Sequence, residues 1–338
     1  MRDRPLCGIG PGAHRPDRWI VALCHHRTVN EPDALLDPDP ILGFYGPRTA
    51  MWRINREAVL LAAGPAALLL QVAHPLVAEG VAQHSRFEAD PFARLRRTLH
   101  TTMDLVYGDG ETAQAAVRRL NGVHARVRGE VSDDVARTAT GATTYRALDP
   151  ALLLWVQVTL VVTSVRATER WVRRVGDAEA DTLWREARAL GVRMGIPLER
   201  SPADWPALMA YWHAMLAPDG PLQVTPTALR LAPTIIRPRL PLAPGWLVGV
   251  TALPGLALLP ERIRRGYGIR WSPAHERGAA LLGRSLRLWV RVMPPDWRAM
   301  PQARAADRRV RAADRRVRDP GPVASQLRGT RAAAKRRD

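Results

Sequence analysis

The chain has 338 residues, 46% of them hydrophobic, and a formal net charge of +18 at pH 7. This hydrophobic content is typical of a globular protein and too high for a disordered one. Two cysteines, Cys7 and Cys24, exclude a disulfide scaffold and a four-cysteine zinc site. Lys335 is the only lysine, so nearly all of the 50 basic residues are arginine. A GC-rich genome explains that excess, and the excess alone identifies no partner.

Residues 1–38 are rich in Pro, Arg, Asp and His and show no sustained periodicity, which predicts a flexible leader. The hydrophobic run 19–24 is shorter than the roughly 7–15 residues of a signal-peptide core. The cysteines and histidines of this segment fit no zinc-ligand spacing. We therefore expect a cytoplasmic bacterial protein with no metal site in its leader.

Residues 39–295 predict a succession of helices in one domain. Apolar residues recur at spacings of three and four, and no run alternates apolar and polar residues over the length of a strand. Asp149 and Pro150 form an N-cap and first-turn pair ahead of a long helix. In chain order, the predicted helices are 48–63, 64–73, one opening at Pro75, 91–107, 111–128, 151–175, 178–194, 202–216, 246–259 and 273–292. The sequence therefore predicts an all-α fold.

Two segments are hydrophobic enough to raise the question of a membrane span. The segment 240–260 reaches the length of about 20 residues that a span needs, but prolines interrupt it. The segment 152–162 is shorter, which is typical of a buried core helix. We expect a soluble protein, with peripheral membrane contact through 246–259 as the alternative.

Residues 296–338 are strongly basic and contain a duplicated heptad, RAADRRV, at 304–310 and again at 311–317. One valine in each heptad, Val310 and Val317, is too little for a coiled coil. We therefore expect a solvated, disordered tail. A weaker alternative is that its charge binds nucleic acid or anionic lipid. No segment has the features of a DNA-reading helix, so no specific nucleic-acid partner is expected.

The predicted helix 111–128 carries a histidine in the middle of its apolar stripe. Val117, Leu120, His124 and Val127 lie three or four residues apart and share one face, and Arg128 follows His124 by one turn. A histidine that faces the core must find partners for its ring nitrogens. Two interpretations stay open. His124 is either a core histidine bonded to a backbone carbonyl or a ligand of a cofactor buried among the helices.

His74 and His84 share another helical face, in the stretch QVAHPLVAEGVAQHS. Ten residues of helix separate them by roughly 15 Å, so they cannot bind one metal ion. His74 precedes a proline, where a helix is interrupted, and His84 lies near a helix end. Each is either a structural histidine or a residue that lines a pocket.

Arg94 and Thr98 share one face of the predicted helix 91–107. Arginines beside a buried cofactor neutralise its carboxylates, whereas the alternative is the solvated side of an amphipathic helix. The chain has no G-x-S-x-G, Walker A, H-E-x-x-H or strand-linked G-x-G-x-x-G motif, so nothing indicates nucleophilic hydrolysis or nucleotide binding.

Several of these stretches occur together in an order that resembles the MpaB-type oxygenase family, which includes bacterial rubber oxygenase, or latex-clearing protein. In this chain they read WRINREA, LLLQVAHPLVAEGVAQHS, DPFARLRRT, VHARVRG and LDPALLLWVQVTL. The resemblance covers residues 40 to 290. It implies an all-α protein that binds b-type haem. It also implies that O2 is used to cleave a carbon–carbon double bond in an isoprenoid chain.

The resemblance also implies roles for single residues. His124, with Arg128 four residues on, corresponds to the proximal haem ligand, and Arg94 and Thr98 correspond to residues beside the haem. A lysine just before the threonine, a candidate distal ligand in the rubber enzymes, is Arg97 here, and an arginine cannot lose a proton to bind iron. His74 and His84 complete the candidate cofactor-binding set.

Gln157 departs from the family pattern, because it stands where the family has a histidine in the long helix. An amide forms hydrogen bonds but cannot replace histidine as a ligand or proton shuttle. We still expect a haem-b-dependent oxygenase that uses O2 on a hydrophobic, isoprenoid-like alkene. Its iron ligand would be His124 and its catalytic residues Arg94, Thr98 and Gln157. The alternative is a helical protein, with or without haem, that lacks oxygenase activity and serves as a sensor, store or scaffold.

Overall fold

Proline and small polar residues mark the starts of the principal helices. The Asp149 side chain accepts a hydrogen bond from the Ala151 amide at the start of α8 (Pro150–Trp171). Pro150 occupies the first turn, where a missing N–H costs nothing. Ser272 caps α14 (Pro273–Val292) in the same way. These local signals explain why both helices begin at, or within one residue of, the positions that the sequence predicts.

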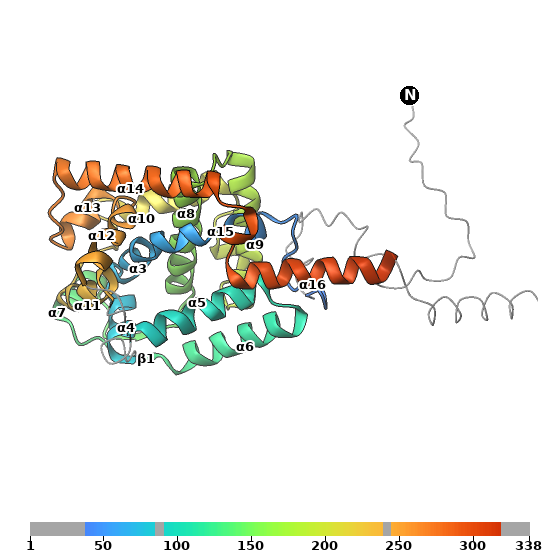
Figure 1. Ribbon diagram of the computed structural model, residues 1–338. Coiled ribbons are helices and arrows are strands. Elements are labelled where there is room, and N and C mark those ends of the chain that lie inside the picture. The colour runs from blue at the N-terminus through green and yellow to red at the C-terminus, as the bar shows by residue number, and fades with distance from the viewer. Residues whose placement is uncertain (1–37, 85–90, 239–244, 319–338) are drawn as a thin grey trace, which may run out of the picture.

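The structure, a computed structural model, describes residues 38–84, 91–238 and 245–318, with only the backbone described for 91–95, 245–248 and 316–318. The helices other than α8 and α14 are α2 (Ala50–Asn55), the 3-10 helix η2 (Ala58–Ala63), α3 (Gly64–Val72), α4 (Pro75–His84), α5 (Pro91–Tyr107), α6 (Gly110–Arg126), α7 (Asp134–Thr140), α9 (Asp177–Arg193), the 3-10 helix η3 (Leu198–Arg200), α10 (Trp205–Leu216), α11 (Pro226–Ile236), α12 (Gly245–Leu256), α13 (Glu261–Gly266), α15 (Pro295–Arg298) and α16 (Pro301–Arg318) (Figure 1). Within the described ranges, the named strands are β1 (Arg128–Glu130) and β2 (Thr144–Arg146), which pair antiparallel. The prediction of an all-α fold is confirmed.

Helix α8 lies at the centre of the fold and packs against α2, α3, α9, α14 and η2. Its Trp155 is fully buried, stacks on Trp212 with 5.7 Å between ring centroids, and donates its indole N–H to the Leu70 carbonyl. By length and composition, α8 is the one described helix that could cross a membrane by itself. The segment η2–α3 and helix α4 meet the same criteria when taken together, with a bend of 107° between them. Of the α8 window, 67% is buried inside the protein, as in a core helix. The prediction of a core helix at 152–162 is confirmed.

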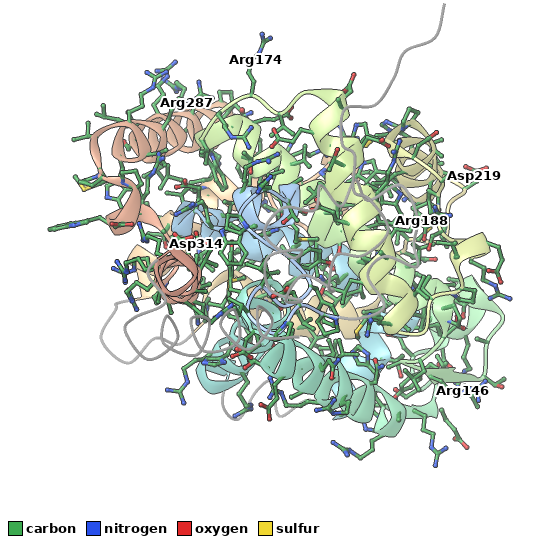
Figure 2. All side chains as sticks on the ribbon, turned by 90° about the vertical axis from the view of Figure 1, so that its right-hand side faces the viewer. Arg146, Arg174, Arg188, Asp219, Arg287 and Asp314 are labelled. Carbon is green, nitrogen blue, oxygen red and sulfur yellow. The ribbon has the colours of Figure 1, made fainter. Side chains whose placement is uncertain are left out.

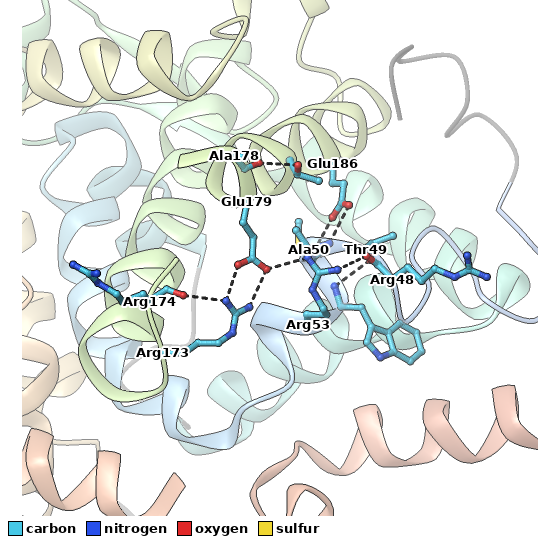
Figure 3. Close-up of polar contacts among 12 residues, drawn as sticks. Arg48, Thr49, Ala50, Arg53, Arg173, Arg174, Ala178, Glu179 and Glu186 are labelled. Carbon is cyan, nitrogen blue, oxygen red and sulfur yellow. Dashed lines mark hydrogen bonds and ion pairs between the residues drawn. The ribbon is translucent and has the colours of Figure 1, made fainter. Parts of the chain in front are cut away.

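A buried carboxylate fixes α2 on α9. Glu186 of α9 accepts hydrogen bonds from the Ala50 and Met51 amides at the first turn of α2 (Figure 3). These amides have no partner inside their own helix, and the helix dipole favours an anion there. Nearby, Glu179 pairs with both Arg53 and Arg173. The chain segment that opens the described fold is therefore held against α9 by charge.

A second buried network ties α4 to α7 and α11. Glu79 has no exposed surface and accepts hydrogen bonds from Gln83, Thr227, and both the amide and the hydroxyl of Ser132. Asp133 caps α7 and also accepts from the Thr227 amide. Both carboxylates are fully engaged in joining helices, so they are structural groups.

Residues 301–318 correct the prediction of a solvated tail. They form α16, which packs along α5 (Figure 1). Ala303 and Ala306 are fully buried, and Val310 packs against the main core. These residues form a stripe at spacings of three and four. Valine is sparse in this repeat, but alanine also allows close packing against a neighbouring helix. Residues 319–338 of the predicted tail and almost all of the predicted leader lie outside the described residues.

Two other predicted segments differ from the structure. The predicted helix 48–63 divides into α2 and η2, because Glu57 is extended and pairs with Ala299, and the Met300 amide donates to the Arg56 carbonyl. In the segment 246–259, Ala252 and Leu256 are buried, and α12 packs against α3, η2 and α14. That half of the segment is not free to contact a membrane.

Candidate functional site

Helices α5 and α6 form an antiparallel hairpin that carries half of the predicted site residues. Asp109 caps α6 by accepting a hydrogen bond from the Thr112 amide, directly after α5 ends. The beginning of α5, with Arg94, therefore lies beside the end of α6, with His124 (Figure 1). The hairpin brings two sequence-predicted residues into one region, although the side chain of Arg94 is outside the described residues.

His124 lies on the last turn of α6 and has an unusual environment for a histidine. Its side chain is mostly buried, and its Nδ1 has no hydrogen-bond partner among the described residues. Burial lowers the pKa of the imidazole below its ordinary value, because desolvation disfavours the charged ring. The ring is therefore neutral at pH 7. Nothing in the described chain supports the interpretation of a core histidine bonded to a carbonyl.

The helix that carries His124 ends earlier than the sequence predicts. Helix α6 stops at Arg126, and Val127 turns into an extended conformation. Arg128 belongs to β1 opposite Arg146 and is exposed. The pairing of β1 with a strand more than ten residues downstream ends the helix, so Arg128 does not follow His124 along one helical face.

Two side-chain amide oxygens are also buried without a hydrogen-bond partner among the described residues, as His124 Nδ1 is. Asn121, one turn before His124, donates its Nδ2 to the Arg193 carbonyl at 2.9 Å. Gln157 of α8 donates its Nε2 to the Ala187 carbonyl at 2.6 Å. Both carbonyls belong to α9, and both side-chain oxygens, Asn121 Oδ1 and Gln157 Oε1, are buried without a partner among the described residues.

The unpartnered atoms lie in two places, on α6 at Asn121 and His124 and on α8 at Gln157, and each indicates a ligand or water beside it. Each buried polar atom without a partner costs about 1–3 kcal/mol. Asn121 and His124 are one turn apart on α6, and Asn121 and Gln157 both donate to carbonyls of α9. Sequence analysis missed Asn121. Its only sequence signal is the three-residue spacing to His124, which places both on one face of α6.

His74 lies at the break between α3 and α4. Its carbonyl accepts from the Ala78 amide, so it closes the first turn of the helix that Pro75 opens. The side chain is buried, and its Nδ1 has no partner in the described part of the chain. Burial lowers the pKa of His74 to about 4, against a weaker opposing effect of the Asp149 charge. His74 is therefore a neutral, buried imidazole at pH 7.

His84 and the two described residues of the arginine–threonine motif are exposed. His84 Nε2 lies 3.0 Å from the Arg128 carbonyl, and its ring meets the edge of Tyr145, so His84 joins α4 to β1. The side chains of Arg97 and Thr98 lie on the solvent side of α5. In the described part of the chain, no contact places the side chain of Arg97 or Thr98 beside His124.

A ligand set for a bare metal ion is absent from the described ranges, since no three His, Cys, Asp or Glu side chains cluster there. The leader's cysteines and histidines lie outside those ranges. A haem needs only one or two protein ligands, so the fit rests on single residues. A buried, neutral histidine with an unpartnered ring nitrogen has the chemistry that iron ligation requires, because only the neutral imidazole binds a metal. His74 meets this condition, and His124 has the same chemistry at its buried Nδ1 although its side chain is only partly buried.

Comparison with known proteins assigns the chain to a family. The family model described as ER-bound oxygenase mpaB/B′/rubber oxygenase, catalytic domain, matches residues 51–293. Uncharacterized proteins of Mycobacterium tuberculosis and Mycobacterium bovis are each 29% identical over 242 residues, which cover 68% of this chain and 89% of the relative. No solved structure matches the chain. The chain belongs to the family of MpaB and rubber oxygenase catalytic domains, as its ordered sequence motifs predict.

Proposed function

We propose that this protein is a haem-b-dependent oxygenase that uses O2 to oxidise or cleave a hydrophobic, isoprenoid-like alkene. The observation that carries the proposal is His124, a mostly buried and neutral imidazole with an unpartnered ring nitrogen, within a family of oxygenase catalytic domains. One ring nitrogen of His124 would bind the iron. Bound haem would supply the activation of O2, which no side chain can provide.

The arginines of the hairpin and ribbon would hold the acidic edge of the haem. Arg97 and Arg128 are exposed, and Arg94 begins the same hairpin. Haem carboxylates stay partly hydrated, so exposed guanidinium groups beside a buried ligand suit them. Arg97 stays protonated and therefore cannot itself bind iron.

The surroundings of His124 favour an apolar substrate. Val117 is buried on α6, and Leu99 and Leu120 pack against the main core from the two arms of the hairpin. Gln157 would contribute only a hydrogen-bond acceptor. Its Nε2 is committed to the Ala187 carbonyl, and its Oε1 remains a free acceptor. Gln157 therefore can accept a hydrogen bond from a ligand and cannot exchange a proton with it.

The test is an assay for carbonyl products. The full chain is loaded with haem and incubated with polyisoprene and with short isoprenoids under 18O2, and aldehydes and ketones are trapped as hydrazones for mass spectrometry. Labelled carbonyl ends support cleavage. The His124→Ala variant should form none, whereas His213→Ala, which removes an exposed histidine on α10, should match the wild type.

One observation favours a second function. Gln157 stands where the family has a histidine, and this favours a protein that binds haem without oxidising a substrate. In that case the wild type binds haem but forms no carbonyl product. Gln157→His would then gain activity if the missing histidine is the reason. Absence of haem binding in the wild type would overturn both proposals.

A further inference from the structure

The outer face of α14 is apolar although it faces solvent. Leu281, Leu288 and Val292 are 62–63% exposed. The opposite face of the helix, with Ala279, Gly283 and Val290, is buried against the protein and holds α14 in place. Single exposed leucines are ordinary, but α14 places its most exposed apolar residues along one line.

The spacing explains that line. Leu288 and Val292 follow Leu281 by seven and eleven residues, which returns each side chain to nearly the same side of the helix. Trp297, on α15 just after α14 ends, is 73% exposed, the highest value among the large apolar residues that the structure describes. The Arg298 guanidinium donates to the Val290 carbonyl at 2.8 Å, so α15 is fixed to the end of α14.

A row of arginines runs beside the apolar line. Arg277, Arg284 and Arg291 are seven residues apart, and all are exposed. Arg287 donates to the Glu169 and Arg170 carbonyls at the end of α8 and lies at the edge of the molecule with Arg174 (Figure 2). The apolar line is therefore bordered by fixed positive charge.

Acidic groups on this face are few. On α14 the one carboxylate is Glu276, which lies 3.8 Å from Arg170 and accepts from the Trp271 indole. Asp296 is exposed on α15. The arginine row thus keeps a net positive potential, which an anionic partner would neutralise.

We propose that α14 and α15 form a docking face for the surface of an anionic lipid bilayer. A helix that lies flat on a membrane needs an apolar stripe with basic residues along its border, and tryptophan favours the interface between headgroups and acyl chains. Leu281, Leu288 and Val292 would enter the acyl boundary. Arg277, Arg284 and Arg291 would meet the lipid phosphates.

A second copy of the chain fits this face less well. In a symmetric dimer the same patch meets itself, so the arginine rows of the two copies would lie close together and repel each other. A bilayer with anionic headgroups offers the opposite charge along the whole helix. The docking face is independent of the haem proposal.

Co-sedimentation with vesicles tests the docking face. The full chain is mixed with vesicles of equal parts phosphatidylcholine and phosphatidylglycerol, and with vesicles of phosphatidylcholine alone. The triple variant Leu281→Ser, Leu288→Ser, Val292→Ser keeps every charge, so it separates insertion of α14 from attraction of the basic chain. We expect binding to the anionic vesicles that the triple variant weakens roughly tenfold or more.

The matched control removes exposed apolar residues elsewhere. The variant Leu148→Ser, Val192→Ser, Leu229→Ser alters side chains that are 38–43% exposed, and it should bind as the wild type does. Brominated lipids should quench wild-type tryptophan fluorescence more than that of Trp297→Phe. Circular dichroism confirms that each variant is folded.

Three results would overturn the docking face. One is wild-type chain that stays in solution with anionic vesicles. Another is an α14 triple variant that binds them as tightly as the wild type, since charge alone would then explain binding. The third is a dimer in light scattering that the α14 variant dissociates, because the face would then join two copies of the chain.

Discussion

The docking of α16 can be tested through one arginine. Arg309 donates its Nε to the Ile41 carbonyl at 2.7 Å and its Nη2 to the Tyr107 carbonyl at 2.8 Å. Tyr107 is the last residue of α5, where carbonyls lack partners in their own helix and a cation is favourable. Burial lowers the pKa of Arg309 and the Asp109 charge opposes that change, but the guanidinium stays charged. The variant Arg309→Met keeps most of the aliphatic stem and removes both bonds.

The expected cost follows from those two bonds. A hydrogen bond to a charged group contributes about 1.5–3 kcal/mol when buried, and Arg309 is only half-buried, so we take about 2–3 kcal/mol for both together. For a protein of this size, that loss lowers the melting temperature by about 3–4 °C. Arg308, the residue before it, is exposed on the same helix, so Arg308→Met is the matched control, with an expected change below about 0.5 kcal/mol.

Thermal and urea unfolding, followed by circular dichroism, measure both variants. Amide hydrogen exchange adds a local readout, since loss of the Tyr107 contact should increase exchange at the end of α5 before the rest of the fold responds. Equal melting temperatures for Arg309→Met, Arg308→Met and the wild type would refute the docking of α16 and restore the solvated tail.

Three further predictions concern buried polar groups. The pKa of His74 is about 4 in the folded chain, below the ordinary value of 6.5, so stability should fall by about 3 kcal/mol as pH drops from about 6.5 to about 4, and His74→Met should lose that part of the slope in urea titrations. Glu79→Ala leaves four donors without their acceptor and should cost about 3–5 kcal/mol, and a loss below about 1 kcal/mol would contradict the buried network. A Cβ on Gly191 would lie 2.7 Å from Gln157 Oε1, so Gly191→Ala and Gln157→Ala should couple by roughly 1 kcal/mol in a double-mutant cycle, whereas additive effects would contradict the contact.

Local signals predicted most of the helices. Pro91 and Tyr107 bound α5 as expected, and Asp149 with Pro150 marks the start of α8. Capping residues and prolines act within one turn of a helix, so they can be identified from the sequence alone. The errors arise where distant segments meet. Glu57 breaks the helix predicted from 48 to 63 by pairing with Ala299, which no local pattern reveals.

The same limit applies to α16 and to the site. Ala306 lies in a basic heptad whose sequence predicts a solvated tail. It is buried only because α16 packs against α5, which no local pattern indicates. His124 could be singled out because it interrupts an apolar stripe and matches a family motif. Asn121 could not, because its significance depends on the Arg193 carbonyl of α9, far along the chain. The roles of Arg94 and Thr98 stay predictions.

The absorption spectrum of the purified chain loaded with haem tests the central proposal most directly. We predict a Soret band in the wild type, altered or lost in His124→Ala and retained in His213→Ala. His74→Met distinguishes the two buried imidazoles, and it should keep the wild-type band if His124 is the iron ligand. No Soret band in the wild type, or an unchanged band in His124→Ala, would contradict the assignment.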